Sequence, residues 1–101
     1  MIMDINTVLS ALANPARLDI LYWLKEPERH FPPQKDTAPK GGVCVSHIRD
    51  KTALSQPTVS LYLSTLYRAG LVSSTRVGQW TYYRYEHDVA ESFLHELSER
   101  L

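Results

Sequence analysis

Apolar residues follow a helical spacing at both ends of this chain and through its middle, and they alternate only between residues 71 and 85. Positions three, four or seven apart form one apolar stripe over 4–13 and another over 88–101, which predicts an amphipathic helix at each end. Residues 71–76 and 80–85 alternate instead and are rich in Val, Thr, Tyr and Trp, which predicts a hairpin around Val77, Gly78 and Gln79. The chain is therefore expected to be mainly α-helical with one β-hairpin.

Segment 46–69 predicts two helices joined by a tight turn. A short helix, roughly Ser46 to Lys51, precedes a longer one whose buried stripe consists of Val59, Leu63 and Leu66. Ser55 is suited to cap the longer helix, and Pro57 lies in the first turn, where backbone N–H groups have no intrahelical partner. Gly70 supplies a stop. This spacing matches a helix-turn-helix, with 71–85 following as a wing, and such a unit fits the grooves of DNA.

The face of the longer helix opposite its apolar stripe carries short side chains that can contact DNA. Gln bonds an adenine edge bidentately, Ser and Thr bond bases or phosphates, and Leu contacts a thymine methyl group. The candidate base contacts are Gln56, Thr58, Ser60 and Leu61, and the candidate phosphate contacts are Ser64, Arg68 and Arg76. Ser55 and Pro57 at the helix start and Gln79 at the wing tip complete the predicted surface. The alternative is an ordinary solvated helix face.

Four strings of residues, in order and at matching spacing, carry a family resemblance. They are Asn14-Pro15-Ala16-Arg17 leading into Leu18, Ile20 and Leu21; Leu54 to Ser60; Ala69 to Val72; and Trp80 with Tyr82, Tyr83 and Arg84. Over nearly the whole chain the sequence resembles the winged-helix repressors of the ArsR/SmtB type. The resemblance implies one winged helix-turn-helix domain over 1–101, with four helices, two strands and a final helix. It also implies a sequence-specific DNA-binding repressor.

Some positions depart from the pattern of that family. Ala53 stands where the turn commonly has Gly, and Arg49 and Thr52 replace residues that are usually apolar. Leu61 and Tyr62 stand where many members have a basic residue and a His, and Gln79 replaces a frequent wing Arg. The operator sequence therefore cannot be carried over from the family.

Length and composition suit a single cytoplasmic domain. The 101 residues with 44% hydrophobic content are enough for one core, although a chain this small gains stability by dimerising. We expect no membrane span, because no uninterrupted apolar run approaches the required length. A single Cys excludes an internal disulfide framework and fits a reducing compartment.

Charge is segregated along the chain even though the formal net charge is +0. From Val43 to Tyr85 five basic residues stand against one acidic residue, a net of +4, whereas Glu86 to Leu101 has one basic against five acidic, a net of −4. The basic share thus falls on the predicted DNA-binding surface.

The terminal helices, 4–13 and 88–101, by default cover the core of the domain. The resemblance implies that they also build a homodimer, through Val8, Leu9, Leu12, Val89, Phe93 and Leu97. A two-fold dimer places its two reading helices about one DNA turn apart, roughly 34 Å, and so predicts a palindromic site.

Segment 26–42 is rich in Pro and Gly and cannot be regular structure throughout. Irregular segments longer than about 12–15 residues are usually functional or disordered. Two interpretations stay open, a mobile insertion between helices and a lid that responds to an unknown small-molecule, metal or redox effector. The second is attractive because the segment leads directly to Cys44.

Cys44 is interpreted as a buried structural residue or, alternatively, as part of a metal- or thiol-responsive site. Metal-sensing members of the resembled family have Cys-Val-Cys where this chain has Cys44, Val45 and Ser46. Half the thiolate pair is missing, which leaves His47 and His30 as the remaining candidate ligands. His87 and His95 lack the spacing of the family's other metal site. We therefore predict no cofactor and no complete metal site.

The sequence does not indicate an enzyme, because it contains no phosphate-binding Gly-rich loop, nucleophile elbow or HExxH motif. A second alternative is a winged helix that binds a partner protein. Salt separates that alternative from DNA binding, because phosphate contacts weaken steeply as salt rises.

Overall fold

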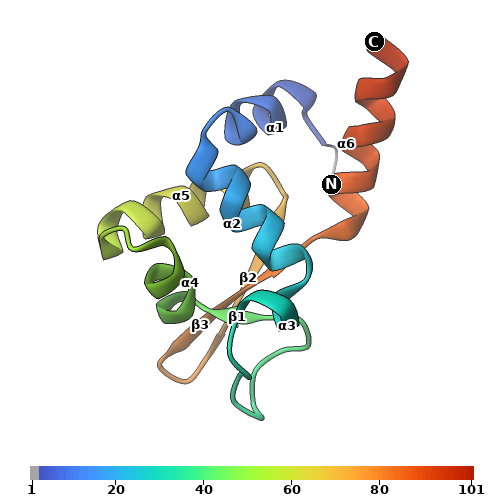
Figure 1. Ribbon diagram of the computed structural model, residues 1–101. Helices are drawn as coiled ribbons and strands as arrows, with labels where there is room; N and C mark the ends of the chain where they lie inside the picture. The colour runs from blue at the N-terminus through green and yellow to red at the C-terminus, as the bar shows by residue number, and fades with distance from the viewer. Residues whose placement is uncertain (1–2) are drawn as a thin grey trace.

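The computed structural model describes residues 3–101, and over this range six helices and three short strands form a winged helix-turn-helix (Figure 1). The helices are α1 (Ile5–Leu12), α2 (Pro15–Lys25), α3 (Pro27–His30), α4 (Val45–Thr52), α5 (Gln56–Arg68) and α6 (His87–Arg100). The strands are β1 (Val43–Cys44), β2 (Val72–Val77) and β3 (Trp80–Tyr85). The predicted fold class, mainly α with a β-hairpin wing and a final helix, is confirmed.

Side chains around Asn14 fix the corner between α1 and α2. The Asn14 side chain caps α2 by accepting a hydrogen bond from the Arg17 backbone N–H at 3.1 Å, and Pro15 occupies the first turn. The Arg17 guanidinium donates back to the last carbonyls of α1, at 2.7 Å to Ala11 and 3.2 Å to Ser10. It also lies 5.4 Å from the ring centroid of Tyr62 on α5. One side chain thus ties three helices together.

The sheet has one more strand than the sequence predicted. Its order is β1-β3-β2, and all pairs are antiparallel, with Val43 opposite Tyr83 and Cys44 opposite Tyr82. The wing hairpin pairs Val77 with Trp80, so the turn has two residues instead of the expected three. Gly78, the first turn residue, has φ +62°, a conformation that Gly adopts without strain.

The main core lies between the helices and one face of this sheet. Its fully buried side chains include Val8, Ile20, Leu24, Ile48, Val59, Leu63 and Leu66. Val43 and Val72 contribute from the strands, and Tyr83 and Tyr85 pack against the same cluster. Because directly opposed strand residues share a face, Cys44 and Tyr82 stand on the other side of the sheet.

Residues 31–42, here called the strap, cover that outer face. Tyr82 is only 2% exposed and Cys44 only 6%, although both point away from the main core. Gly42 approaches so closely that a Cβ there would lie 3.2 Å from the Cβ of Tyr82. The Lys35 ammonium lies 5.1 Å from the ring centroid of Trp80 in the wing. The Pro-rich segment thus begins with the helical turn α3 and then packs along the sheet.

The bounds of three helices differ by one residue at each end from the sequence prediction. The first helix of the helix-turn-helix extends one residue further at each end than the expected 46–51, and the terminal helices are α1 and α6 within one residue of 4–13 and 88–101. None of the helices described over residues 3–101 is long and apolar enough to cross a membrane.

Candidate nucleic-acid interface

The turn between α4 and α5 holds the two helices at a fixed angle. Ala53 adopts the left-handed conformation with φ 59°. Thr52 bridges the turn, because its hydroxyl donates to the Arg49 carbonyl at 2.9 Å and accepts from the Leu54 N–H at 3.1 Å. Beneath the turn, Ile48 is fully buried. Thr52 therefore closes the turn through hydrogen bonds instead of through apolar packing.

Ser55 and Thr58 build the start of α5. The Ser55 oxygen accepts from the Thr58 backbone N–H at 3.3 Å, and its hydroxyl donates to the Thr58 hydroxyl oxygen at 2.8 Å. Pro57 occupies the first turn beside them. The predicted cap is confirmed, and it leaves the Thr58 hydroxyl proton able to donate to a ligand.

The outer face of α5 is open to a partner. Gln56, Pro57, Ser60 and Leu61 are all exposed, and Leu61 keeps 59% of its surface in solvent. Ser64 lies half-buried at the edge of this surface. The structure thus brings the predicted base-contact candidates together on one side of one helix, with Thr58 at its half-buried margin.

Arg49 is a member of this surface that the sequence did not identify. Its guanidinium donates to the Gln56 amide oxygen at 3.2 Å, and the Gln56 amide nitrogen donates to Ser60 at 3.4 Å. Arg49 also pairs with Asp50 at 3.1 Å. The general geometry of a helix-turn-helix, in which the first helix ends beside the start of the second, was the signal that could have found it.

At the tip of the wing, Arg76 and Gln79 are exposed. The Arg76 side chain donates to the Gly78 carbonyl at 3.0 Å, which holds its guanidinium over the turn. Arg84, the other Arg of this hairpin, lies at the base of the wing and pairs with Glu86 at 3.1 Å. Glu86 also accepts from Ser73 at 2.7 Å, so Arg84 is engaged within the protein.

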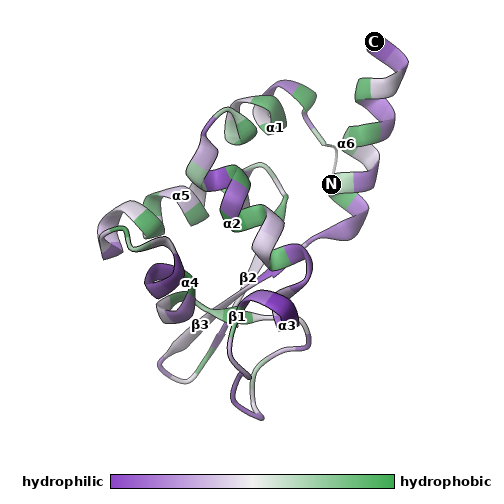
Figure 2. Cartoon of the chain, in the orientation of Figure 1, coloured by the Kyte–Doolittle hydropathy of each residue, from purple (hydrophilic) through white to green (hydrophobic). Residues whose placement is uncertain are grey.

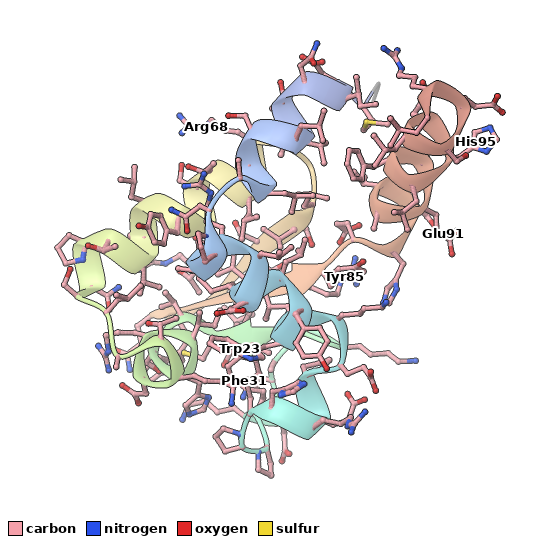
Figure 3. All side chains as sticks on the ribbon, turned by 45° about the horizontal axis from the view of Figure 1, so that its top comes forward. Trp23, Phe31, Arg68, Tyr85, Glu91 and His95 are labelled. Carbon is pink, nitrogen blue, oxygen red and sulfur yellow. The ribbon has the colours of Figure 1, made fainter. Side chains whose placement is uncertain are left out.

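Arg68 lies at the opposite end of α5 from Gln56, beside α1 (Figure 3). At 1.5 Å per residue the two are separated by about 18 Å along the helix axis. Within residues 3–101 neither Arg68 nor Arg76 forms an ion pair. Both guanidinium groups therefore remain available to phosphates, at the two ends of the candidate surface.

Two wing tyrosines, Tyr83 and Tyr85, pack against the core and carry no negative charge. Burial, with a smaller contribution from neighbouring Tyr67, raises the pKa of Tyr83 above its ordinary value. Burial, with a smaller contribution from Glu91, likewise raises the pKa of Tyr85. Both hydroxyls therefore stay protonated at neutral pH.

The metal-ligand candidates do not converge. The Cys44 sulfur contacts the Ser46 oxygen at 3.2 Å, and His47 contacts Gln34 through Nδ1 at 2.9 Å. His30 packs instead against Tyr22, with ring centroids 5.4 Å apart. In the part of the chain that the structure describes, no three His, Cys, Asp or Glu side chains are grouped to hold a metal ion.

The terminal helices α1 and α6 contact each other, and apolar positions recur along both (Figure 2). Val8 and Phe93, two of the predicted dimer contacts, are buried within this chain's own core, at 0% and 6% exposure. Leu9 is exposed, whereas Leu12, Val89 and Leu97 are half-buried. Leu94, which lies outside the predicted apolar stripe, is 62% exposed, and Leu101 is 96% exposed. Of the predicted dimer contacts, Val8 and Phe93 are therefore covered by this chain itself, whereas the other four keep accessible surface.

Known proteins are similar to this chain in sequence and in fold. The family model described as "Bacterial regulatory protein, arsR family" matches residues 40–74, which span β1, α4, α5 and the start of β2. The HTH-type transcriptional regulator YbzH of Bacillus subtilis (strain 168) is 49% identical over 83 residues, covering 81% of this chain and 83% of YbzH.

Solved structures agree with that match. The homodimeric winged helix-turn-helix DNA-binding domain of Mb0332 from Mycobacterium bovis superposes with a TM-score of 0.66 at 31% identity, covering 94% of this chain and 76% of that one. NolR from Sinorhizobium fredii superposes with a TM-score of 0.61 at 35% identity, covering 93% of this chain and 80% of that one.

Proposed function

Because this chain belongs to the arsR family of bacterial regulatory proteins, whose members are DNA-binding transcriptional regulators and not enzymes, we propose that it is a homodimeric repressor of a palindromic operator. The observation that carries the proposal is the exposed face of α5, where Gln56, Ser60 and Leu61 stand together beside Arg49. In a helix-turn-helix this end of the second helix enters the major groove.

Gln56 is the residue we expect to contribute most to base preference. Its hydrogen bonds to Arg49 and Ser60 hold the amide at the exposed start of α5, so less side-chain freedom is lost when it binds a base edge. Thr58, Ser60 and Leu61 read neighbouring positions, and Ser64, Arg68 and Arg76 contact the backbone. Ser55 and Pro57 position the helix start, and Gln79 lies beside Arg76 at the wing tip.

The homodimer is supported by an apolar stripe on the outer side of α6. Ala90, Leu94, Leu97 and Leu101 recur at helical spacing, and Leu94 and Leu101 are exposed in the single chain. Leu9 and Leu12 offer a similar surface on α1. Contiguous exposed apolar surface is typical of an interaction site. The homodimeric state of the Mb0332 domain, which superposes over 94% of this chain, supports a second copy as the occupant.

The test begins by selecting bound duplexes from a random pool, followed by anisotropy titrations on a selected and a scrambled duplex. If Arg68 and Arg76 of both protomers contact phosphates, affinity should fall about a hundredfold between 50 and 200 mM salt. The selected sequences should contain two related half-sites about 10 base pairs apart, or a multiple of that spacing. Absence of duplex binding at low salt would contradict the proposal and favour a protein partner instead.

A further inference from the structure

A small cavity lies where the strap, the start of α4 and the wing meet. Its volume is about 220 Å³, and it is lined by Gln34 and Lys35 of the strap, Ser46 and His47 of α4, and Trp80 and Tyr82 of β3, with Pro33 and Cys44 completing the wall. An engineered cavity of about 150 Å³ holds benzene, and pockets for drug-sized ligands begin near 300 Å³. The cavity is therefore of a size for one aromatic ring with a small substituent.

Gln34 holds the strap in place over this cavity. Its side-chain amide oxygen, Oε1, accepts a hydrogen bond from the Cys44 N–H at 2.9 Å. The amide nitrogen, Nε2, is therefore the donor in the other contacts of this side chain. That nitrogen reaches the Pro32 carbonyl at 2.8 Å and His47 Nδ1 at 2.9 Å. Both amide protons are then used, so Nδ1 of His47 accepts and, in the neutral ring, the proton sits on Nε2. His47 thus presents an N–H donor through its other nitrogen.

Within the part of the chain that the structure describes, the Tyr82 hydroxyl is an unpaired polar group in a residue that lines the cavity. Tyr82 lines the cavity and is 2% exposed, and its hydroxyl oxygen is buried with no hydrogen-bond partner among residues 3–101. Buried polar groups in native proteins are almost always hydrogen-bonded, to protein or to a bound molecule. The hydroxyl therefore has an unused capacity to donate that the rest of the chain does not meet.

The wall of the cavity favours an anionic group. Lys35, His47, Ser46, Trp80 and Tyr82 all bear N–H or O–H donors, and no Asp or Glu is among the lining residues. The indole of Trp80 and the ring of Tyr82 supply flat apolar surface against which the aromatic ring of a ligand can pack. We propose that this cavity is a binding site for a small monocyclic aromatic carboxylate.

An occupant of this cavity would contact both the helix-turn-helix and the wing. Ser46 and His47 belong to α4, the first helix of the helix-turn-helix, and Trp80 directly follows the wing turn. If the proposed DNA-binding function holds, binding at the cavity is coupled to operator affinity, because the ligand and the strap bridge the two elements. Couplings of this kind typically change affinity about 5- to 150-fold.

Binding is tested without DNA, using benzoate as the probe. The chain has two Trp residues, so a Trp23→Phe background leaves Trp80 as the sole indole reporter. We expect saturable quenching of Trp80 fluorescence by benzoate, with half-saturation below about 1 mM, a value within the limit of binding energy per ligand atom. Acetate, which lacks the ring, and benzyl alcohol, which lacks the charge, should bind at least about tenfold more weakly.

Variants separate a ligand contact from a structural role. Tyr82→Phe should weaken benzoate binding about tenfold while leaving the melting temperature unchanged or higher, because the hydroxyl has no partner to lose. Tyr83→Phe, the neighbouring change on the opposite face, is the matched control and should bind benzoate as the parent does. Absence of saturable quenching at 10 mM benzoate, or unchanged affinity in Tyr82→Phe, would overturn the proposal and leave a cavity that holds water only.

The coupling is tested last, on the selected operator duplex. Saturating benzoate should change operator affinity at least fivefold in the parent and not in Tyr82→Phe. Unchanged operator affinity despite benzoate binding would support the site and overturn its coupling. Because the fluorescence titration needs no operator, a failure of the proposed DNA-binding function and a failure of this site remain distinguishable.

Discussion

The proposed DNA contacts at the start of α5 and at the wing tip predict separable effects of single substitutions. Gln56 lies on the face that we propose enters the groove, whereas Arg76 is a charge held over the wing turn by the Gly78 carbonyl. Gln56→Ala should relax base preference at one position of each half-site, with a loss of about 1–3 kcal/mol on the preferred sequence. Arg76→Ala should weaken all duplexes alike and lower the slope of log affinity against log salt by about 2 per dimer.

Anisotropy titrations of both variants, on the selected duplex and on single-base changes of it, measure the difference. Arg29→Ala serves as the control for loss of a positive charge, because Arg29 lies in α3, where it pairs with Glu26. A uniform loss for Gln56→Ala across all duplexes would contradict its role in base reading.

At position 53 the backbone conformation favours Gly over the Ala that is present. Ala53 has φ 59°, a conformation that costs an L-residue roughly 1–2 kcal/mol. Gly avoids this strain but loses more conformational freedom on folding, so only part of the strain energy is recovered. Ala53→Gly should stabilise the fold by about 0.5–1 kcal/mol and raise the melting temperature by about 3–6 °C. Calorimetry at a fixed protein concentration measures this change.

Ala13→Gly is the matched control for Ala53→Gly. Ala13 is also exposed and also follows a helix, but its φ is −81°, so Gly there should lower the melting temperature. Equal shifts of the same sign in the two variants would show that backbone conformation at Ala53 is not the cause.

At the scale of elements, the strap depends on one amide. Gln34→Ala removes three hydrogen bonds and leaves the Cys44 N–H without its partner. We expect a loss of about 1–3 kcal/mol in unfolding free energy and faster hydrogen exchange at the Cys44 amide. Gln79→Ala, a change of the same type at the exposed wing tip, should do neither. An unchanged Cys44 exchange rate in Gln34→Ala would mean that the strap is held by other contacts.

The elements that the sequence predicted are those with strong local signals. The Ser55 cap with Pro57 in the first turn and the apolar stripe of α5 are each written within one or two helical turns. Strand β1 was missed because two residues are too short to show alternation, and Val43 and Cys44 become a strand only by pairing with Tyr83 and Tyr82. Contacts between distant segments leave no such local pattern.

The same reason explains what was missed at the candidate sites. Tyr82 alternates like any strand residue, and its burial depends on the strap, some forty residues earlier in the chain, which packs over it. The predicted dimer contacts were chosen from one apolar stripe on each terminal helix, but Val8 and Phe93 of those stripes face the chain's own core. Periodicity identifies an apolar face and does not say which neighbour covers it.

At the scale of the whole molecule, the proposed dimer predicts a residue-specific response. Leu94 is 62% exposed on α6, so Leu94→Gln should cost the folded monomer little while weakening association. Sedimentation velocity at micromolar concentration should show a shift from dimer toward monomer. Operator affinity should fall with it, because the two reading helices no longer bind as a pair.

Leu61→Gln is the matched control, since Leu61 is 59% exposed but lies on α5. It should sediment as the unmodified protein does. A Leu94→Gln variant that remained fully dimeric would place the interface elsewhere than on α6.

Strand β1 runs into α4 without an intervening residue and is hydrogen-bonded to β3 of the wing. The helix-turn-helix is consequently tied to the wing by backbone hydrogen bonds, which limits how far their separation can adjust to the duplex. The DNA must then supply the adjustment, and the energy of bending it or changing its groove width depends on sequence. We therefore expect this protein to discriminate between duplexes at base pairs that lie between its contacts and that no side chain touches.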